Sequence, residues 1–537
     1  MFDLRNKKIR ISSIKEIAIF SIILILAISL RIWVMLRWPI SADEAFWANQ
    51  AREIIKNQRP FYEISIPYIG PIISYILIPS IYLFGNNIVL LRIPIVIISI
   101  LSIIVVYLFS RKYYNRNVAL VSALILSVIP NDFVNSSQTV EGPIIELLTV
   151  LVLYLLTKYK ENGKNSYLFF LGLINGIGVL TSFAYLFFLV PFVLTLTIFP
   201  KKSFRKFQAR SWIVISLAFI LGFSPMIYWN LLNNFYSISF IFQNFPTTLS
   251  GTNLLDVKTN LFRGYSDFLN DFNKINREMY EIDAGTRSFS ILFLIFLLLF
   301  IIIPIRQLSS KNTEILRKNF YLFIIFFILL ILKSMITISE FNLEDLVVLY
   351  PLSSIIVSWS FVLIISNLKK YQFVIIILFL LFISYTVTLS LEKINEKITE
   401  INKDSCVKII PEFSKYQNST KISNVIVSTS HSFRIFKFYF PDITSNYLVG
   451  IYQALENYDK YYPKIWEENN QTFVGDNTTY VFINEKCDCC WSKNLPIYKT
   501  FSDFLAEYNK TLKLEKTFYY DNATNESLFQ VFSLNVK

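Results

Sequence analysis

The stretch IAIFSIILILAISLRIWVML, residues 17–36, contains one charged side chain, Arg31, among twenty residues. A helix of this length spans about 30 Å, the thickness of the hydrocarbon core of a bilayer. The rest of the chain has a similar character, because 54% of its 537 residues are hydrophobic and only 17% are charged. One soluble core cannot bury so much apolar surface, so the sequence predicts a polytopic α-helical membrane protein. This excludes a cytosolic enzyme, a secreted disulfide scaffold and a disordered binder.

About eleven membrane crossings are expected. The apolar stretches that carry them are residues 17–36, 88–109, 117–134, 143–157, 211–229, 288–305, 319–338, 346–366 and 371–390, together with 166–199, which is long enough for two short spans that turn near Thr181 and Ser182. The stretch 67–84 is short and contains three prolines. We interpret it as a membrane-surface or re-entrant segment.

The distribution of charge predicts the orientation of these spans. Before residue 392 the chain holds 34 Lys and Arg against 20 Asp and Glu. If 67–84 does not cross, 22 of the 34 basic residues fall in loops on one face, which the positive-inside rule makes cytoplasmic. We therefore expect a multi-pass protein of the plasma membrane with a cytoplasmic N-terminus. Retention of basic loops also explains the net charge of +13 without a nucleic-acid partner.

The chain divides into a transmembrane domain, residues 1–391, and an extracellular tail, residues 392–537. The first external loop, 38–87, is expected to carry interfacial helices, and the long aromatic loop 230–287 to fold over the site as a lid. The tail has alternating apolar runs that predict strands mixed with short helices, and hence an α+β domain. These runs are Val425–Ser428, Ile435–Phe440, Thr479–Ile483 and Phe529–Phe532.

Glycosylation acceptors and cysteines gather on the face predicted to be external. The Asn-x-Ser/Thr sequons are Asn135, Asn418, Asn470, Asn477, Asn509, Asn522 and Asn525. The four cysteines, Cys406, Cys487, Cys489 and Cys490, all lie in the tail. A disulfide from Cys406 to one of the later three is the natural choice among several connectivities. A zinc site is the weaker alternative, because the chain lacks paired Cys-x2-Cys motifs and has a single histidine.

The richest candidate site follows the first span, in SADEAFWANQAREII at residues 41–55. Ser41 or Asp43 can cap a helix here. An apolar stripe that could lie in the membrane interface is formed by Phe46, Trp47, Gln50, Ile54 and Ile55. In the simpler alternative, Asp43 and Glu44 do no chemistry and only favour the N-terminus of the helix through its dipole.

Several motifs follow this segment in a characteristic order. They are Pro-Tyr-x-x-Pro-x-x-x-Tyr at 67–75, Leu-Phe-Gly at 83–85, Leu-Arg-Ile-Pro at 91–94, Tyr-Leu-Phe-Ser-Arg-Lys-Tyr-Tyr-Asn-Arg at 107–116, Ile-Pro-Asn at 129–131, and Glu141 at the start of a span. The order resembles the GT-C superfamily of integral-membrane glycosyltransferases, in particular the branch of protein O-mannosyltransferases and aminoarabinose transferases. The resemblance covers about residues 10–230.

This resemblance implies a GT-C-like fold and a sugar donor carried on a polyprenyl phosphate. In the family the Asp of the first loop, here Asp43, is the general base on an acceptor hydroxyl, which displaces the lipid phosphate with inversion. Glu44 and Glu141 complete the expected catalytic group. Asp43 and Glu141 could also hold a divalent cation, Mg²⁺ or Mn²⁺, as in oligosaccharyltransferase relatives, although a metal is more useful for a diphosphate donor than for a monophosphate donor. The chain departs from the family at Glu141, where an Asp is usual, and at Gly70, where some members carry Lys.

The leaving phosphate needs cations, and the candidates are Arg52, Arg59, Arg92 and Lys333. Arg52 and Arg59 have a simpler alternative role in solvating the interfacial helix, and Arg92 in snorkelling. Lys333 lies within an apolar span, which favours a paired or functional role, with Glu340 as its partner or as an acceptor-site residue. Trp47, Tyr68 and Glu340 are the residues expected to contact the acceptor or another part of the substrate.

The expected partners are membrane lipid, the polyprenyl-phosphate-linked sugar, and a glycan, lipid or protein acceptor. Two other classes of function stay open on the sequence. A transporter or lipid flippase would show broken-helix repeats and several charges within its spans, and this chain has few. A membrane scaffold for the tail would have no activity to lose when Asp43 is changed.

Overall fold

The computed structural model describes residues 2–57, 69–198, 209–237, 239, 274–277, 280–283, 295–296, 347–403, 424–427, 438–439, 444–447, 479–483, 510–521 and 526–536. They form two compact units. The first comprises Met1–Arg37, Ile54–Tyr82 and Val89–Ile394, and the second comprises Trp38–Glu53, Leu83–Ile88 and Asn395–Lys537. Part of the first loop thus groups with the tail, and the predicted boundary at residues 391 and 392 falls inside one helix.

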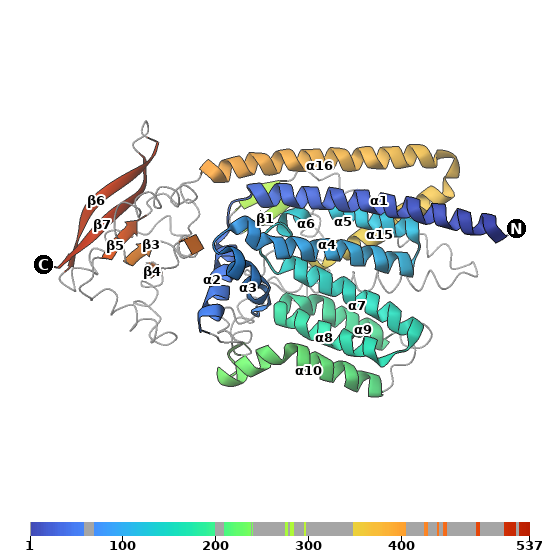
Figure 1. Cartoon of the computed structure of the whole chain (residues 1–537), viewed down its shortest axis with the longest axis horizontal. Helices are drawn as coiled ribbons and strands as arrows, with labels where there is room; N and C mark the ends of the chain where they lie inside the picture. Colours follow the sequence, from blue (N-terminus) through green and yellow to red (C-terminus); the bar gives the residue numbers. More distant parts are fainter. Residues whose placement is uncertain are drawn as a thin grey trace, which may run out of the picture. The chain divides into compact units, whose positions relative to one another are not determined.

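The first unit is a bundle of helices (Figure 1). Its helices are α1 (Phe2–Arg37), α3 (Ile72–Phe84), α4 (Ile88–Tyr113), α5 (Arg116–Val128), α6 (Pro130–Asn135), α7 (Gly142–Asn162), α8 (Asn165–Thr181), α9 (Leu186–Ile198), α10 (Ala209–Leu232), α15 (Leu349–Asn367) and α16 (Gln372–Lys403), with a few terminal residues of α3, α4 and α16 assigned to the second unit. Among the described residues, six helices are long and apolar enough to cross a membrane, and four more are apolar but shorter. The predicted polytopic helical membrane fold is confirmed. The predicted spans 288–305 and 319–338 lie almost wholly outside the described residues.

The helices α4, α7, α10 and α15 agree with predicted spans to within a few residues, whereas α1 and α16 extend well beyond the predicted 17–36 and 371–390. The expected turn near Thr181 and Ser182 is present, because α8 ends at Thr181 and Ser182 is extended. The expectation of one continuous span over 117–134 is wrong, because α5 ends at Val128 and α6 begins at Pro130. Pro130 has no N–H to continue the helical ladder, and Ile129 is extended at φ −62° and ψ 118°.

Small residues let α8 and α10 approach closely. A Cβ added at Gly176 would lie 2.2 Å from the Phe219 carbonyl oxygen, and one added at Gly222 would lie 2.4 Å from that of Leu173. The backbones of α8 and α10 are therefore in direct contact at both glycines. Such contacts suit a membrane, where apolar side chains gain nothing by leaving lipid and close packing must hold helices together.

Buried serines line several helices of the bundle. The hydroxyls of Ser122, Ser127, Ser353 and Ser390 each donate to the carbonyl oxygen four residues earlier in their own helix, over 2.6–2.8 Å. Each polar group is thus satisfied locally, which removes most of the cost of burying it.

The second unit contains a mixed five-stranded sheet in the order β4-β3-β5-β7-β6. Its strands are β3 (Asn424–Val427), β4 (Thr444–Tyr447), β5 (Thr479–Ile483), β6 (Lys510–Asp521) and β7 (Glu526–Val536). β3 pairs in parallel with β4 and β5, whereas β7 is antiparallel to β5 and β6. The unit also holds most of α2 (Ala42–Asn57), which belongs to the first loop. The sheet agrees with the strands predicted for the tail, and the short helices expected there stay a prediction. A strand over 435–440 is wrong at its described residues 438 and 439, which are helical.

The structure corrects one of the predicted glycosylation acceptors. Asn135 lies at the end of α6 with only 2% of its surface exposed, so it cannot accept a glycan in the folded protein. The other six sequons and all four cysteines lie outside the described residues, so tail glycosylation and the disulfide stay predictions.

The contact between α8 and α10 gives the first test. We expect Gly176→Ala to lower thermal stability in nanodiscs, by about 1–3 kcal/mol, because the added Cβ forces two backbones apart. Ser166→Ala, at an exposed position near the start of α8, is the control and should melt like the wild type. Equal melting of Gly176→Ala and wild type would contradict the close contact.

Candidate functional site

The first-loop helix α2 begins with a reciprocal cap. The Glu44 backbone N–H donates to Ser41 Oγ over 3.2 Å, and the Ser41 N–H donates to Glu44 Oε2 over 3.0 Å. This is the Ser-x-x-Glu capping box, so Ser41, and not Asp43, is the N-cap. Glu44 is only 1% exposed, so helix capping explains its presence. Its expected catalytic role stays a prediction.

The cap fixes the position of Asp43 in the first turn of α2, where its carboxyl is half-buried. Trp47, expected to contact substrate, is buried one turn further on with its ring edge against Phe46 at 4.8 Å between centroids. The buried Trp47 side chain therefore helps to hold α2 in position. A contact between Trp47 and substrate stays a prediction.

Arg52 joins α2 to two other segments of the second unit. Its guanidinium donates to Asn49 Oδ1 over 2.8 Å and to Asn86 Oδ1, and it lies 4.9 Å over the buried Phe438 ring. Asn86 in turn donates to the Tyr439 carbonyl over 3.4 Å. Arg52 therefore links the first loop to the tail, which is more than the solvation expected of it. Phosphate binding by Arg52 stays a prediction.

Arg92, another candidate for the donor phosphate, is fully buried in the first unit. Its Nη1 donates over 2.9 Å to the Met35 carbonyl in the last turn of α1, a group with no partner inside its helix. A cation at this negative end of α1 stabilises the helix dipole. The buried contact excludes snorkelling as the role of Arg92.

The remaining cation and substrate candidates, Arg59, Tyr68, Lys333 and Glu340, lie outside the described residues. Their roles stay predictions.

Glu141 stands where α7 begins. Its carbonyl accepts from the N–H groups of Ile144 and Ile145, each over 3.0 Å, and its side chain makes no cap to α7. It belongs to the first unit and Asp43 to the second, so their expected proximity stays a prediction. Among the described residues no group of three or more His, Cys, Asp or Glu is arranged to hold a metal ion. A shared Mg²⁺ or Mn²⁺ therefore stays a prediction too.

The segment before Glu141 is polar and yet buried. Residues 130–140 are all buried, although they include seven polar side chains. The described part of loop 230–287 includes the hairpin of β1 (Lys274–Arg277) and β2 (Tyr280–Asp283), and β1 contacts α6. A lid function of this loop stays a prediction.

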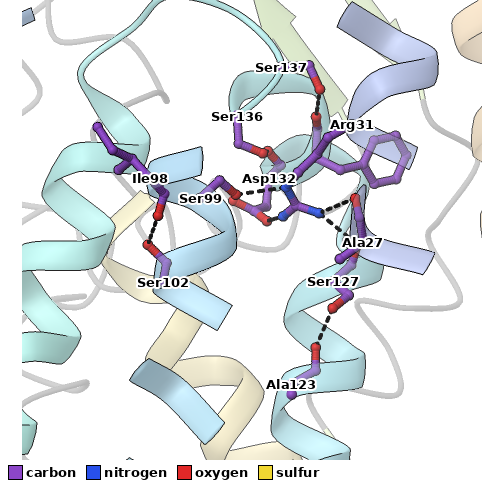
Figure 2. A network of polar contacts seen from close by, with 11 residues as sticks. Ala27, Arg31, Ile98, Ser99, Ser102, Ala123, Ser127, Asp132, Ser136 and Ser137 are labelled. Atoms are coloured by element: carbon purple, nitrogen blue, oxygen red, sulfur yellow. Dashed lines mark hydrogen bonds and ion pairs between the residues drawn. The ribbon is translucent and has the colours of Figure 1, made fainter. Parts of the chain in front are cut away.

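An ion pair inside the bundle holds this segment (Figure 2). Arg31 of α1 is 0% exposed and its Nη2 lies 2.5 Å from Oδ2 of Asp132, which is 1% exposed. Its Nε donates to Ser99 Oγ over 2.7 Å, and Nη1 to the carbonyls of Ala27 and Ser127 over 3.3 Å each. One side chain thus connects α1, α4, α5 and α6.

Glu146, in the second turn of α7, adds a second buried carboxyl. It is 1% exposed, and its oxygens accept no hydrogen bond from an N–H or hydroxyl of the described residues. It lies close enough to Asp132 and Arg31 to interact with both electrostatically. Arg31, Asp132 and Glu146 thus form a triad of buried ionisable side chains.

Sequence reasoning missed this triad. The sequence signal for it was one Arg in an apolar span and two acidic residues in other apolar stretches. Charges inside a membrane need partners, so such residues are expected to pair. The pairing itself joins positions 101 residues apart, which no local pattern reveals.

The structure explains why this chain has Gly70 where some members of the resembled family carry Lys. A Cβ there would lie 2.0 Å from the Leu180 carbonyl oxygen, beside the bridge between Ile69 and Ser182. No side chain fits at this position, so a Lys cannot contribute to phosphate binding from it.

Comparisons with known proteins agree with this architecture. Residues 67–229 match the family model described as dolichyl-phosphate-mannose-protein mannosyltransferase. No curated protein sequence is significantly similar to the chain. The resemblance to membrane glycosyltransferases of the GT-C superfamily is confirmed by this match and by two solved folds.

The first fold is that of ArnT from Cupriavidus metallidurans bound to undecaprenyl phosphate, with 10% identity, a TM-score of 0.61 and 97% of each chain covered. The second is the Archaeoglobus fulgidus oligosaccharyltransferase tethered to an acceptor peptide. There the identity is 12%, the TM-score 0.52, and the match covers 97% of this chain and 74% of that one. At these identities the likeness establishes a common fold.

The capping box gives the second test. Glu44→Gln keeps an acceptor for the Ser41 N–H and should melt like the wild type, whereas Glu44→Ala should lose about 0.5–2 kcal/mol. Thermal unfolding of both variants measures this. Equal destabilisation by Gln and Ala would show that the carboxylate charge, and not the cap, is what the fold needs.

Proposed function

We propose that this chain is a glycosyltransferase that moves a sugar from a polyprenyl phosphate to an acceptor hydroxyl at the outer face of the membrane. One observation carries the proposal: the likeness of fold to ArnT bound to undecaprenyl phosphate extends over 97% of both chains. The family match over 67–229 supports it independently.

The physical chemistry of the substrate agrees with this assignment. A polyprenyl-phosphate sugar has a tail that dissolves in lipid and a headgroup that dissolves in water, so transfer must take place at the interface. The first loop leaves α1 at the end of a span, and its cap holds the Asp43 carboxyl in the first turn of α2.

In the proposed reaction the acceptor oxygen forms a bond to the anomeric carbon as the bond from that carbon to the phosphate oxygen breaks. The acceptor proton passes to Asp43, the lipid phosphate leaves with the electron pair, and the anomeric configuration inverts. Arg52, Arg59, Arg92 and Lys333 are the cations proposed to stabilise the leaving phosphate, with Glu141 as the second acidic group. Of these, Arg92 already donates to the Met35 carbonyl inside the bundle, and this bond competes with phosphate binding.

The proposed orientation places the N-terminus in the cytoplasm and the tail outside, as the positive-inside rule indicates. The acceptor is a glycan, lipid or protein, and the tail is the part of the chain proposed to handle it.

The third test removes the proposed base. We expect Asp43→Asn to lower kcat by about 10²–10⁴-fold, because a general base typically contributes this much. Transfer is measured in nanodiscs with a panel of labelled polyprenyl-phosphate hexoses and pentoses and a pool of glycan, lipid and peptide acceptors.

Glu53→Gln, on the same helix, is the matched control for the loss of a carboxylate and should retain full transfer. Undiminished transfer by Asp43→Asn would remove Asp43 as the base. Movement of labelled lipid between leaflets, without any transfer by the wild type, would favour the flippase alternative. Loss of transfer on chelation, restored by Mg²⁺ or Mn²⁺, would support the proposed metal, and indifference to chelator would refute it.

A further inference from the structure

We propose that Asn86 is a positioning residue for the acceptor: its side-chain amide joins the first loop to the tail, and so fixes the tail relative to the helix that carries Asp43. The inference rests on the proposed function, in which Asp43 is the base and the tail handles the acceptor. It goes beyond that function by naming the contact through which the tail acts.

The division of the chain supplies the first observation. Two segments of the first loop, Trp38–Glu53 and Leu83–Ile88, group with Asn395–Lys537 in one compact unit. Asp43 therefore belongs to the same unit as the sheet of the tail. The reacting atoms of acceptor and enzyme have to meet at about 3–3.5 Å, so a part of the chain that binds the acceptor must be held in register with the base. The contacts between loop and tail thus bear on the reaction.

Asn86 stands just after a sharp turn at the end of α3. This helix ends at Phe84, and Gly85 follows in the left-handed conformation with φ 60°. Glycine adopts this conformation without strain and commonly ends helices in this way. The turn places the half-buried Asn86 between α2 and the tail, as its hydrogen bonds show.

The amide of Asn86 uses its two ends for different segments. Its Oδ1 accepts from the guanidinium of Arg52 in α2, and its Nδ2 donates to the Tyr439 carbonyl of the tail over 3.4 Å. An amide carries an acceptor and a donor, so one side chain can connect a cation to a carbonyl. Asn86, Arg52, Phe438 and Tyr439 together form what we call the junction.

Arg52 completes the junction on the side of α2 away from the base. Its guanidinium lies 4.9 Å over the buried ring of Phe438, and a cation is attracted to the face of such a ring. Arg52 follows Asp43 by nine residues, about two and a half helical turns, so the two residues lie on opposite sides of α2. One side of the helix is therefore joined to the tail, and the other side carries Asp43.

Loss of the Asn86 amide should loosen the junction without releasing the tail, because Arg52 and Tyr439 make further contacts within the chain. A looser tail holds the acceptor less well in register with Asp43. The lipid donor has no contact with Asn86 in this proposal, so its binding should not change. The two substrates are thus expected to respond differently.

The test variant is Asn86→Asp. Its carboxylate keeps an acceptor oxygen for Arg52 but has no N–H for the Tyr439 carbonyl. In the nanodisc assay, the member of the acceptor pool that the wild type uses fastest is titrated at saturating lipid donor, and the donor is then titrated at saturating acceptor. We expect KM for the acceptor to rise about three- to tenfold, the effect of one lost hydrogen bond on an equilibrium constant. KM for the donor and kcat should not change.

Asn117→Asp is the matched control. Asn117 is exposed on α5, so the substitution makes the same change of charge away from the junction. The control should have wild-type kinetics with both substrates. Amide hydrogen exchange at Phe438 and Tyr439 should be faster in Asn86→Asp than in Asn117→Asp.

Two kinetic results would overturn the inference. One is a wild-type KM for the acceptor in the folded Asn86→Asp variant. The other is a rise in KM for the lipid donor alone, which would assign Arg52 to the lipid phosphate. If Asn86→Asp does not fold, Asn86→Ala takes its place, because it removes both bonds of the amide and predicts the same split between the substrates.

Failure of the proposed function gives a different pattern. If the wild type transfers no sugar from any donor, the reaction is refuted, and the junction is judged by exchange alone. Faster exchange at Phe438 and Tyr439 in Asn86→Asp then supports the link between loop and tail. Equal exchange in the variant and the wild type overturns it.

Discussion

The buried guanidinium of Arg31 joins four helices of the helical unit. In hydrocarbon every backbone polar group must find a partner, and a helix break leaves several without one. Arg31 donates to one such group, the Ser127 carbonyl at the end of α5, and its other hydrogen bonds go to Ala27 in α1, Ser99 in α4 and Asp132 in α6. The charge it carries is balanced within the same cluster by Asp132. A polar segment can therefore lie inside an apolar bundle and lead to an acidic residue at the start of α7.

The first loop combines a local helix cap with contacts to residues distant in the sequence. Ser41 and Glu44 close the end of α2 on each other, and the helix then lies against Asn86 and Phe438 through Arg52. Residues that resemble catalytic or phosphate-binding groups in the sequence thus have structural partners. Asp43 lies beside this cap and takes no part in its two hydrogen bonds.

Hydrophobic runs and composition were sufficient to predict the long helices of the bundle. Apolar runs predicted α4, α7 and α10 to within a few residues, because long apolar helices are dictated by the solvent around them. The break at Ile129 was missed, because Pro130 inside an apolar run is equally compatible with a kinked span. Strands β3 and β5 were found from alternation, whereas the run at 435–440 alternates in the same way and is helical at its two described residues. The contacts of Arg31, Arg52 and Arg92 depend on tertiary neighbours, which no pattern of nearby residues encodes.

The serines that bond their own helices affect how protons could move through the bundle. A row of hydroxyls that bonded one another across the bundle would form a wire along which protons could hop from one side to the other. Ser122, Ser127, Ser353 and Ser390 instead direct their protons to the backbone of their own helices. Because a carbonyl of the same helix accepts each of these protons, the four serines do not form a chain of hydroxyl-to-hydroxyl hydrogen bonds with one another.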